Sequence, residues 1–191
     1  QLDKSSKEDL FLILGDSCDR GNELEKTYEI LFKLQKKSNL IHLIGNHEKM
    51  LEDYYMGIER KTYLINENGS KKTREILDSN EDLKDKILDF IYEMPHIVYS
   101  ENYIFVHAGI DFNKKIENQD KEEVLWRRDE WYLKNNTGKQ VFYGHTPQKD
   151  ISVINNCYNL DTGICFGLKM SIFEIKNKKL IIIPKILTEK A

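Results

Sequence analysis

Four apolar runs recur along the chain, and each ends at a residue type that can bind a metal ion or carry a proton. Near-continuous apolar runs of this length are typical of strands that are covered on both faces, by layers of helix or by a second sheet. In chain order, the runs with their polar ends are LFLILGD (residues 10–16), LIHLIGNH (40–47), YIFVHAG (103–109) and VFYGH (141–145).

Amphipathic helices are predicted between these strands. Leu24, Tyr28, Leu31 and Leu34 recur at helical spacing, and Asn22 is expected to cap the helix that they form. This alternation of strand and helix predicts the α/β class. Three further helices are expected over residues 48–56, 81–94 and 121–133.

The last quarter of the chain has a different pattern, typical of hairpins. Residues 151–154 and 157–160 flank an Asn-Asn pair, and residues 169–175 and 179–187 flank a short polar turn. We expect residues 66–75, NENGSKKTRE, to form a surface loop, because Asn, Gly and Ser favour turns over a packed element. We do not expect a domain boundary there.

Composition narrows the functional classes. The 191 residues suit one domain, and 29 basic against 32 acidic residues give a net charge of −3, which does not favour a nucleic-acid partner. Three cysteines form no even disulfide framework, and we find neither a signal-peptide pattern nor an apolar run of bilayer length. We therefore expect a cytoplasmic protein with no membrane partner.

The polar ends of the four strands predict a metal site. In open α/β sheets ligands bind beyond the carboxyl ends of the strands, so these side chains are expected to converge. A carboxylate, an amide oxygen and imidazoles suit divalent ions such as manganese, iron or zinc. The converging residues are Asp16, Asn46, His47, His107 and His145.

Two other histidines are interpreted as structural. His42 lies within a strand, and His96 follows Pro95 at a strand start. A single histidine of this kind is more often a hydrogen-bonded core or surface residue than a ligand.

The ordered motifs GDSCDRG, GNHE, VHAG and YGHT resemble those of the calcineurin-like metallophosphoesterases. Their Asp-Arg-Gly and Asn-His-Glu forms resemble the phosphoprotein phosphatase branch, which includes lambda phosphatase and bacterial serine/threonine protein phosphatases. The resemblance implies a β-sandwich flanked by helices (αββα) and a single catalytic domain over residues 1–191.

The resemblance also implies a dinuclear centre. Asp16 matches the carboxylate that bridges two metal ions, and Asn46, His107 and His145 match the other ligands of one of them. The expected cofactors are two divalent ions, manganese first, with iron, zinc, nickel and magnesium as alternatives, and no organic cofactor. Asn46 is further expected to contact the substrate phosphate.

The remaining site residues act on the phosphate and its leaving group. His47 matches the proton donor, and Asp19 matches the carboxylate that orients it. Arg20 and Arg128 match phosphate-binding arginines, although Arg127 beside Arg128 leaves the register of the second one open. Arginine suits this role because its planar fork binds two phosphate oxygens at once.

One motif of the resembled family, Asp-x-His-Gly, does not occur in this chain. It is expected one strand and one helix before residue 10, and Asp3 cannot replace it because Ser5, not histidine, stands two positions later. The polar start at Gln1 further suggests a part of a longer protein. We expect either that the segment exists in the natural protein or that this chain is a defective fragment with one incomplete metal site.

Three functions follow from these residues. The leading interpretation is a metal-dependent phosphatase of phosphoserine or phosphothreonine, with phosphotyrosine as a further substrate. Diadenosine tetraphosphate hydrolysis is an alternative within enzymes, and a non-catalytic pseudo-phosphatase is an alternative outside them. The expected partners are a phosphoprotein or a small phosphoester.

Two residues near the motifs are interpreted as structural. Cys18, where the resembled family usually carries an aliphatic residue, is taken as a small buried hydrophobe in preference to a redox-sensing thiol. Asp161, in LDTGICFG, is taken as a hydrogen-bonding residue in preference to a metal ligand.

Overall fold

A computed structural model describes residues 8–58 and 69–184 of the chain. The chain forms two compact units, residues 1–96 and 97–191. None of the helices within the described ranges combines the length and the apolar character that a bilayer span needs.

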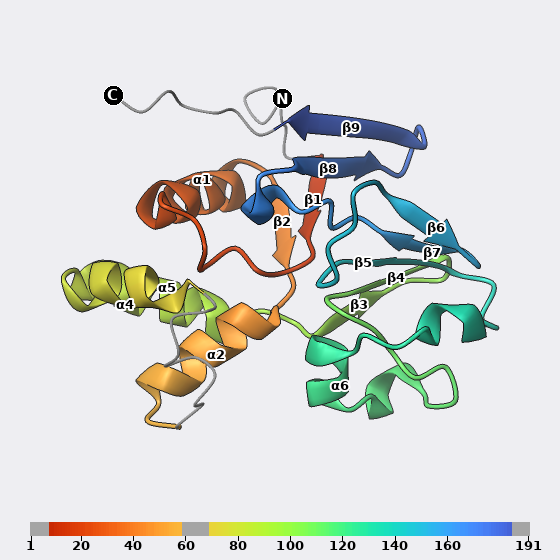
Figure 1. Ribbon diagram of the computed structural model, residues 1–191, viewed down its shortest axis with the longest axis horizontal. Coiled ribbons are helices and arrows are strands. Elements are labelled where there is room, and N and C mark those ends of the chain that lie inside the picture. Colours follow the sequence, from red (N-terminus) through yellow and green to blue (C-terminus); the bar gives the residue numbers. More distant parts are fainter. Residues whose placement is uncertain (1–7, 59–68, 185–191) are drawn as a thin grey trace. The chain divides into compact units, whose positions relative to one another are not determined.

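The first unit is built on two parallel strands joined by a helix (Figure 1). Strands β1 and β2 pair in register, with Leu10 opposite Asn39 and Ile13 opposite His42. Their carboxyl ends therefore lie next to each other, and the polar residues that follow both strands start from the same edge. The elements of this unit are β1 (Leu10–Ile13), α1 (Leu24–Lys37), β2 (Asn39–His42), α2 (Asn46–Tyr55), α4 (Ser70–Asp78) and α5 (Glu81–Tyr92).

The predicted face of helix α1 is confirmed, but its predicted cap is wrong. The apolar residues Leu24, Tyr28, Leu31 and Leu34 are all buried. Helix α1 begins at Leu24, so its N-cap position falls on Glu23, which makes no side-chain capping bond within the described residues. The Asn22 side chain instead accepts a hydrogen bond from Lys72, at 3.0 Å.

An aromatic cluster joins both terminal helices of the first unit to its sheet. The ring of Phe90 in α5 lies 6.3 Å from Tyr28 and 5.6 Å from Phe32, both in α1. His42, the last residue of β2, packs edge-on against the same ring at 5.8 Å, and its Nδ1 lies 2.8 Å from the Leu43 carbonyl. His42 is buried in this core, as the sequence predicts.

The predicted loop over residues 66–75 is wrong in its described part. Residues 70–78 form helix α4, while residues 66–68 lie outside the described ranges. Gly69 begins the turn with a left-handed φ of 75°, and Ser70, Thr73 and Leu77 are buried along one side of the helix. Lys, Arg and Glu are strong helix formers, so this segment has a helical pattern whose buried face is small and partly polar.

The second unit contains a mixed five-stranded sheet and a separate hairpin. The sheet has the order β3-β4-β5-β7-β6, in which β4, β5 and β7 are parallel and the two edge strands are antiparallel. The two predicted hairpins are confirmed as β6–β7 and β8–β9, while residues 185–187 of the last predicted strand lie outside the described ranges. The elements are β3 (Ile97–Tyr99), β4 (Tyr103–Val106), a 3-10 turn (Ile116–Asn118), α6 (Lys121–Trp126), a 3-10 turn (Trp131–Lys134), β5 (Gln140–Tyr143), β6 (Ser152–Ile154), β7 (Cys157–Asn159), a 3-10 turn (Ile164–Phe166), β8 (Lys169–Glu174) and β9 (Lys179–Pro184).

Both faces of the five-stranded sheet are covered by apolar side chains. On one face the Trp131 ring packs against Tyr143, with ring centroids 4.9 Å apart, in a core that also includes Ile104 and Val141. On the other face Phe142 contacts Phe173 of β8, with centroids 5.5 Å apart. This mixed sheet with its helices confirms the α/β class.

The predicted helix over residues 121–133 is too long. Helix α6 ends at Trp126, and the chain at Arg127 is extended, with φ −62° and ψ 132°. The Arg127 guanidinium donates to the Ile110 carbonyl and pairs with Asp129, at 2.6 Å from Nε to Oδ1. These contacts favour the extended conformation, which helical periodicity alone could not predict.

Candidate active site

The loop that follows β1 has an unusual backbone. Gly15 has φ 98°, and three residues with side chains also take left-handed values: Asp16 with φ 61°, Asp19 with φ 65° and Arg20 with φ 55°. Each such residue costs roughly 1–2 kcal/mol relative to the right-handed conformation. Strain of this kind persists only where the surrounding structure holds it, and it concentrates at functional sites.

The carboxylate of Glu48 holds this loop in place. Its Oε2 accepts hydrogen bonds from the backbone N–H groups of Asp16 at 2.8 Å and Gly45 at 2.9 Å. Its Oε1 accepts from the N–H groups of Ser17 at 2.6 Å and Cys18 at 3.3 Å, and from the Ser17 hydroxyl at 3.0 Å. Glu48 is fully buried, so the strained loop is fixed by a carboxylate inside the unit.

Glu48 supports the candidate site, and it was not among the residues predicted from the sequence. It is the third residue of α2, where a glutamate commonly reaches back to the N-cap backbone, and this position was a signal that could have identified it. Its bonds to the loop after β1, about thirty positions earlier in the chain, are a tertiary feature that no local pattern predicts.

The first turn of α2 brings three of the predicted site residues together. Helix α2 starts at Asn46, two residues before its predicted start, and Asn46 and His47 are both buried. The His47 N–H donates to Asp16 Oδ1 at 3.2 Å. A Cβ on Gly45 would lie 2.3 Å from that same carboxylate oxygen, so only glycine permits this approach.

His47 and Asp19 form a buried pair, as predicted. Their Nδ1 and Oδ2 atoms are 2.7 Å apart, and the side chains are 3% and 0% exposed. Burial lowers the pKa of His47, but the hydrogen bond to Asp19 and the charges of Asp16 and Asp19 outweigh it, so the pKa is raised. Because Nδ1 is held by Asp19, the other ring nitrogen, Nε2, is the one left to exchange a proton with a substrate.

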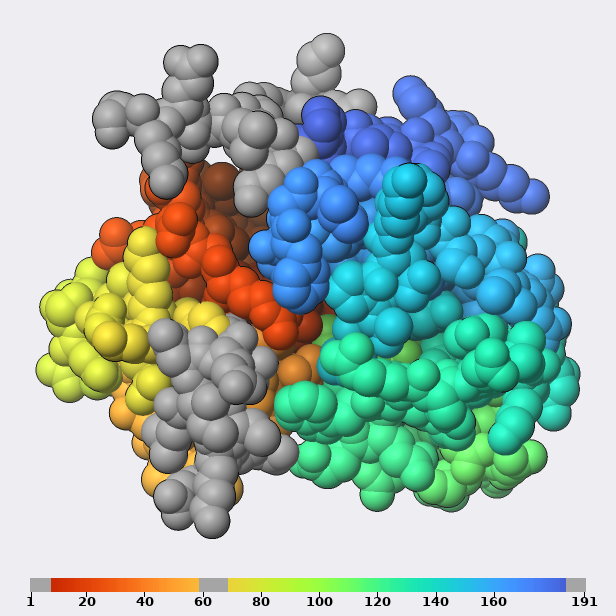
Figure 2. Space-filling view, viewed as in Figure 1, coloured from red at the N-terminus to blue at the C-terminus, as the bar shows by residue number. Residues whose placement is uncertain are grey.

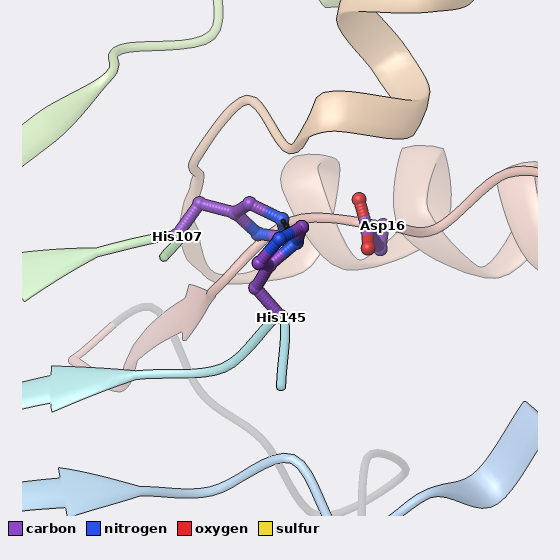
Figure 3. Close-up of side chains that lie close together, drawn as sticks. All are labelled: Asp16, His107 and His145. Carbon is purple, nitrogen blue, oxygen red and sulfur yellow. Dashed lines mark hydrogen bonds between the residues drawn. The ribbon is translucent and has the colours of Figure 1, made fainter. Parts of the chain in front are cut away.

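In the second unit, His107 and His145 lie next to each other. They follow the neighbouring parallel strands β4 and β5, and Figure 3 shows their two imidazole rings side by side. The His107 Nε2 and His145 Nδ1 atoms are 3.2 Å apart, and both residues are buried. His145 takes a left-handed φ of 67°, and the edge of Trp126 packs against its ring at 6.0 Å.

The two neighbouring arginines of the second unit differ in their contacts and in their exposure. Arg127 is held by Asp129 and by the Ile110 carbonyl, so its guanidinium stabilises the local structure. Arg128 is exposed and makes no hydrogen bond or ion pair within the described part of the chain. The Arg128 guanidinium is therefore the more accessible of the two, and its role in phosphate binding stays a prediction.

The donor chemistry of these residues fits a divalent metal ion. The first unit offers a carboxylate at Asp16 and an amide oxygen at Asn46, and the second unit offers two adjacent imidazoles. Carboxylate, amide and imidazole donors together suit manganese, iron or zinc, whereas no thiolate donor that would favour a softer metal is among them.

The two residues interpreted as structural lie in structural environments. Cys18 is 4% exposed, and its burial, together with the negative charge of Glu48, raises the pKa of the thiol well above its usual value. A thiol of this kind is a poor nucleophile, in agreement with the prediction. The Asp161 Oδ1 accepts a hydrogen bond from the Gly163 N–H at 3.0 Å, which shapes a turn.

Comparison with known proteins identifies relatives over nearly the whole chain. A family model described as calcineurin-like phosphoesterase matches residues 1–181. The bis(5'-nucleosyl)-tetraphosphatase PrpE of Geobacillus sp. (strain WCH70) is 27% identical over 90% of this chain and 77% of its own length. Serine/threonine-protein phosphatase 2 of Salmonella typhimurium is also 27% identical, over 92% of this chain and 84% of its own length.

A solved structure has the same fold. It is described as a candidate diadenosine tetraphosphatase, and it matches 98% of this chain and 85% of its own chain with a TM-score of 0.74 at 15% identity. At that identity the match shows the fold alone.

Proposed function

This chain belongs to the calcineurin-like phosphoesterases, a family of hydrolases that use divalent metals, and from this we propose that it hydrolyses phosphate esters at a dinuclear centre. Asp16 and Asn46 from the first unit and His107 and His145 from the second are the proposed ligands of one ion. Asp16 is the only one of them that would also hold the second ion, because the Asp-x-His-Gly motif that would supply its other ligands does not occur in this chain. When bound, two divalent ions would supply a water molecule of lowered pKa and would neutralise the charge on the phosphoryl oxygens. Manganese is the ion that we expect to support turnover best.

The buried pair of His47 and Asp19 is the observation that carries this proposal. A phosphate ester releases an alkoxide, which is a poor leaving group unless a proton reaches its oxygen as the bond breaks. The Asp19 Oδ2 atom lies 2.7 Å from His47 Nδ1, and this hydrogen bond fixes the tautomer of the imidazole. The Nε2 atom is then the one that we propose to protonate the leaving oxygen. Asp19 is thus a positioning residue for the proton donor.

The exposed arginines complete the proposed site. Arg20 stands at the end of the strained loop that carries Asp16 and Asp19, and Arg128 is accessible in the second unit. We propose that both guanidinium groups bind phosphate oxygens, because their forked donors match two oxygens at once. The Asn46 amide is proposed as a further phosphate contact.

Two substrate classes remain as candidates. A buried proton donor favours phosphoserine or phosphothreonine in proteins, because an alkoxide needs the proton more than a phenolate does. The relatives named as bis(5'-nucleosyl)-tetraphosphatases favour dinucleoside tetraphosphates. The first class is a phosphate monoester and the second a phosphoanhydride, so in both cases water attacks a phosphoryl group. A cytoplasmic location stays a prediction.

The proton-donor role is tested with His47→Asn and two leaving groups. We expect turnover of a phosphoserine peptide to fall by about 10²–10⁴, turnover of p-nitrophenyl phosphate to fall far less, and metal content to stay unchanged. His96→Asn is the matched control, since His96 is only half-buried and lies outside the site. Equal losses on both substrates would contradict the proton-donor role.

The substrate class is tested by turnover of the unmodified chain with manganese. Hydrolysis of the phosphoserine peptide supports the protein phosphatase, and preferential hydrolysis of diadenosine tetraphosphate supports the dinucleotide hydrolase. If neither substrate nor p-nitrophenyl phosphate is hydrolysed while two ions bind, the non-catalytic alternative replaces the proposal.

A further inference from the structure

A pocket of about 390 Å³ opens beside Arg20 in the first unit. We call it the lysine pocket, because Lys71 and Lys72 of α4 line it opposite the loop that carries Arg20. In Figure 2 the yellow surface of α4 lies beside the orange-red surface of the segment that leads into α1. The remaining lining residues are Gly21, Asn22, Gly69 and Glu75.

The two sides of the lysine pocket are held against each other. A Cβ on Gly69 would lie 2.5 Å from the Arg20 backbone nitrogen and 2.7 Å from its Cα, so the start of α4 touches the Arg20 backbone directly. Across the pocket the Lys72 ammonium donates to Asn22 Oδ1 at 3.0 Å. Arg20 and Lys72 therefore line the same pocket, on the two segments that these contacts join.

The charge of the lysine pocket is positive. Arg20, Lys71 and Lys72 contribute three cationic groups, and Glu75 contributes the only acidic one among the lining residues. Glu75 and Lys71 are 3.7 Å apart and more than half exposed, so their attraction is weak and an anion can displace it. The pocket therefore favours a ligand with more than one negative charge.

We propose that the lysine pocket binds the additional phosphate groups of a substrate whose reacting phosphate is held by Arg20, and that the substrates are nucleoside polyphosphates. This inference rests on the proposed metal-dependent hydrolysis and selects the second of its two candidate substrate classes, whose leaving group is a nucleotide phosphate, so it does not depend on protonation of an alkoxide by His47. Successive phosphates of a polyphosphate share a bridging oxygen and therefore lie close together. Several of them can thus contact the cationic groups of Arg20, Lys71 and Lys72, which line one small pocket. A singly phosphorylated peptide has no second phosphate to occupy Lys71 and Lys72.

The kinetic test removes both lysines. For Lys71→Ala/Lys72→Ala we expect kcat/KM for diadenosine tetraphosphate to fall about tenfold, since each exposed charged contact contributes a modest amount. The kcat/KM for p-nitrophenyl phosphate should change less than about twofold, because that substrate does not reach the pocket. The matched control is Lys36→Ala/Lys37→Ala, an exposed lysine pair at the end of α1 outside the pocket, which should alter neither value.

Equal changes in kcat/KM for both substrates, or an unchanged kcat/KM for diadenosine tetraphosphate, would overturn the proposed role of the lysine pocket. The proposed phosphoesterase function would not be affected by that result. A wild-type chain that hydrolyses no phosphoester would instead overturn the proposed function. The two failures are therefore distinguishable.

A binding test is independent of turnover. Titration calorimetry of the wild-type chain in metal-free buffer should show tighter binding of inorganic tripolyphosphate than of orthophosphate. Lys71→Ala/Lys72→Ala should weaken tripolyphosphate binding about tenfold, and Glu75→Gln should strengthen it, because the opposing charge is removed. Equal affinity for the two anions, or an unchanged affinity in both variants, would overturn the proposal even if the chain were inactive.

Discussion

Replacing Glu48 with glutamine should destabilise the first unit more than any other single charge removal on α2. One oxygen of Glu48 accepts from the N–H groups of Asp16 and Gly45, and the other accepts from those of Ser17 and Cys18. A glutamine replaces one of these oxygens by an NH₂ group, which donates and cannot accept. In either orientation of the amide, two buried backbone N–H groups lose their acceptor.

The expected cost follows from those two bonds. A hydrogen bond to a charged acceptor contributes about 1.5–3 kcal/mol, so Glu48→Gln should lower the free energy of unfolding by about 3–6 kcal/mol. That is a large share of the roughly 5–15 kcal/mol by which domains are stable. Because the strained loop is no longer held, Asp16 should also lose its position, and the metal affinity of the chain should fall with its stability.

Urea unfolding followed by far-UV circular dichroism is the appropriate assay. The long helices α1, α2, α4 and α5 all lie in the first unit, so this signal reports chiefly on the part that Glu48 stabilises. Glu81→Gln is the matched control, since the Glu81 side chain is 82% exposed and its replacement should change stability by less than about 0.5 kcal/mol. A loss below about 1 kcal/mol for Glu48→Gln would refute the reasoning, because one buried bond alone should cost that much.

Two further predictions concern Gly69 and the thiols. Gly69→Ala should raise the KM of phosphate substrates, because the new Cβ would displace the Arg20 backbone. Gly57→Ala is the control, because Gly57 has a similar φ of 76° and its Cβ would meet no other atom of the described residues. This control should lose only about 1–2 kcal/mol of stability through backbone strain, and its KM should stay unchanged. A thiol-reactive dye should label one cysteine rapidly at neutral pH in the native chain and three after unfolding. Of the three cysteines only Cys165 is exposed, and burial raises the pKa of Cys157 to about 11. Rapid labelling of all three native thiols would contradict this burial.

The sequence by itself determined the elements that carry the site. Alternating apolar strands and amphipathic helices predicted the α/β class, and both α1 and the C-terminal hairpins formed as their periodicity indicated. The polar residue at the end of each strand marked Asp16 and Asn46 in the first unit and His107 and His145 in the second, because neighbouring parallel strands present their carboxyl ends at one edge of their own sheet. These are local and periodic signals, which a single chain carries in its order of residues.

The tertiary structure alone decided which of these residues touch. The pairing of His47 with Asp19 joins residues 28 positions apart, and the role of Glu48 depends on bonds across 30 to 32 positions. Helix α4 formed where Asn, Gly and Ser predicted a loop, because its Lys, Arg and Glu residues favour a helix and because Ser70, Thr73 and Leu77 bury one face of it. Only the folded chain brings α4 against Arg20 and so creates the lysine pocket, because packing between distant segments depends on shape and burial that no local pattern contains.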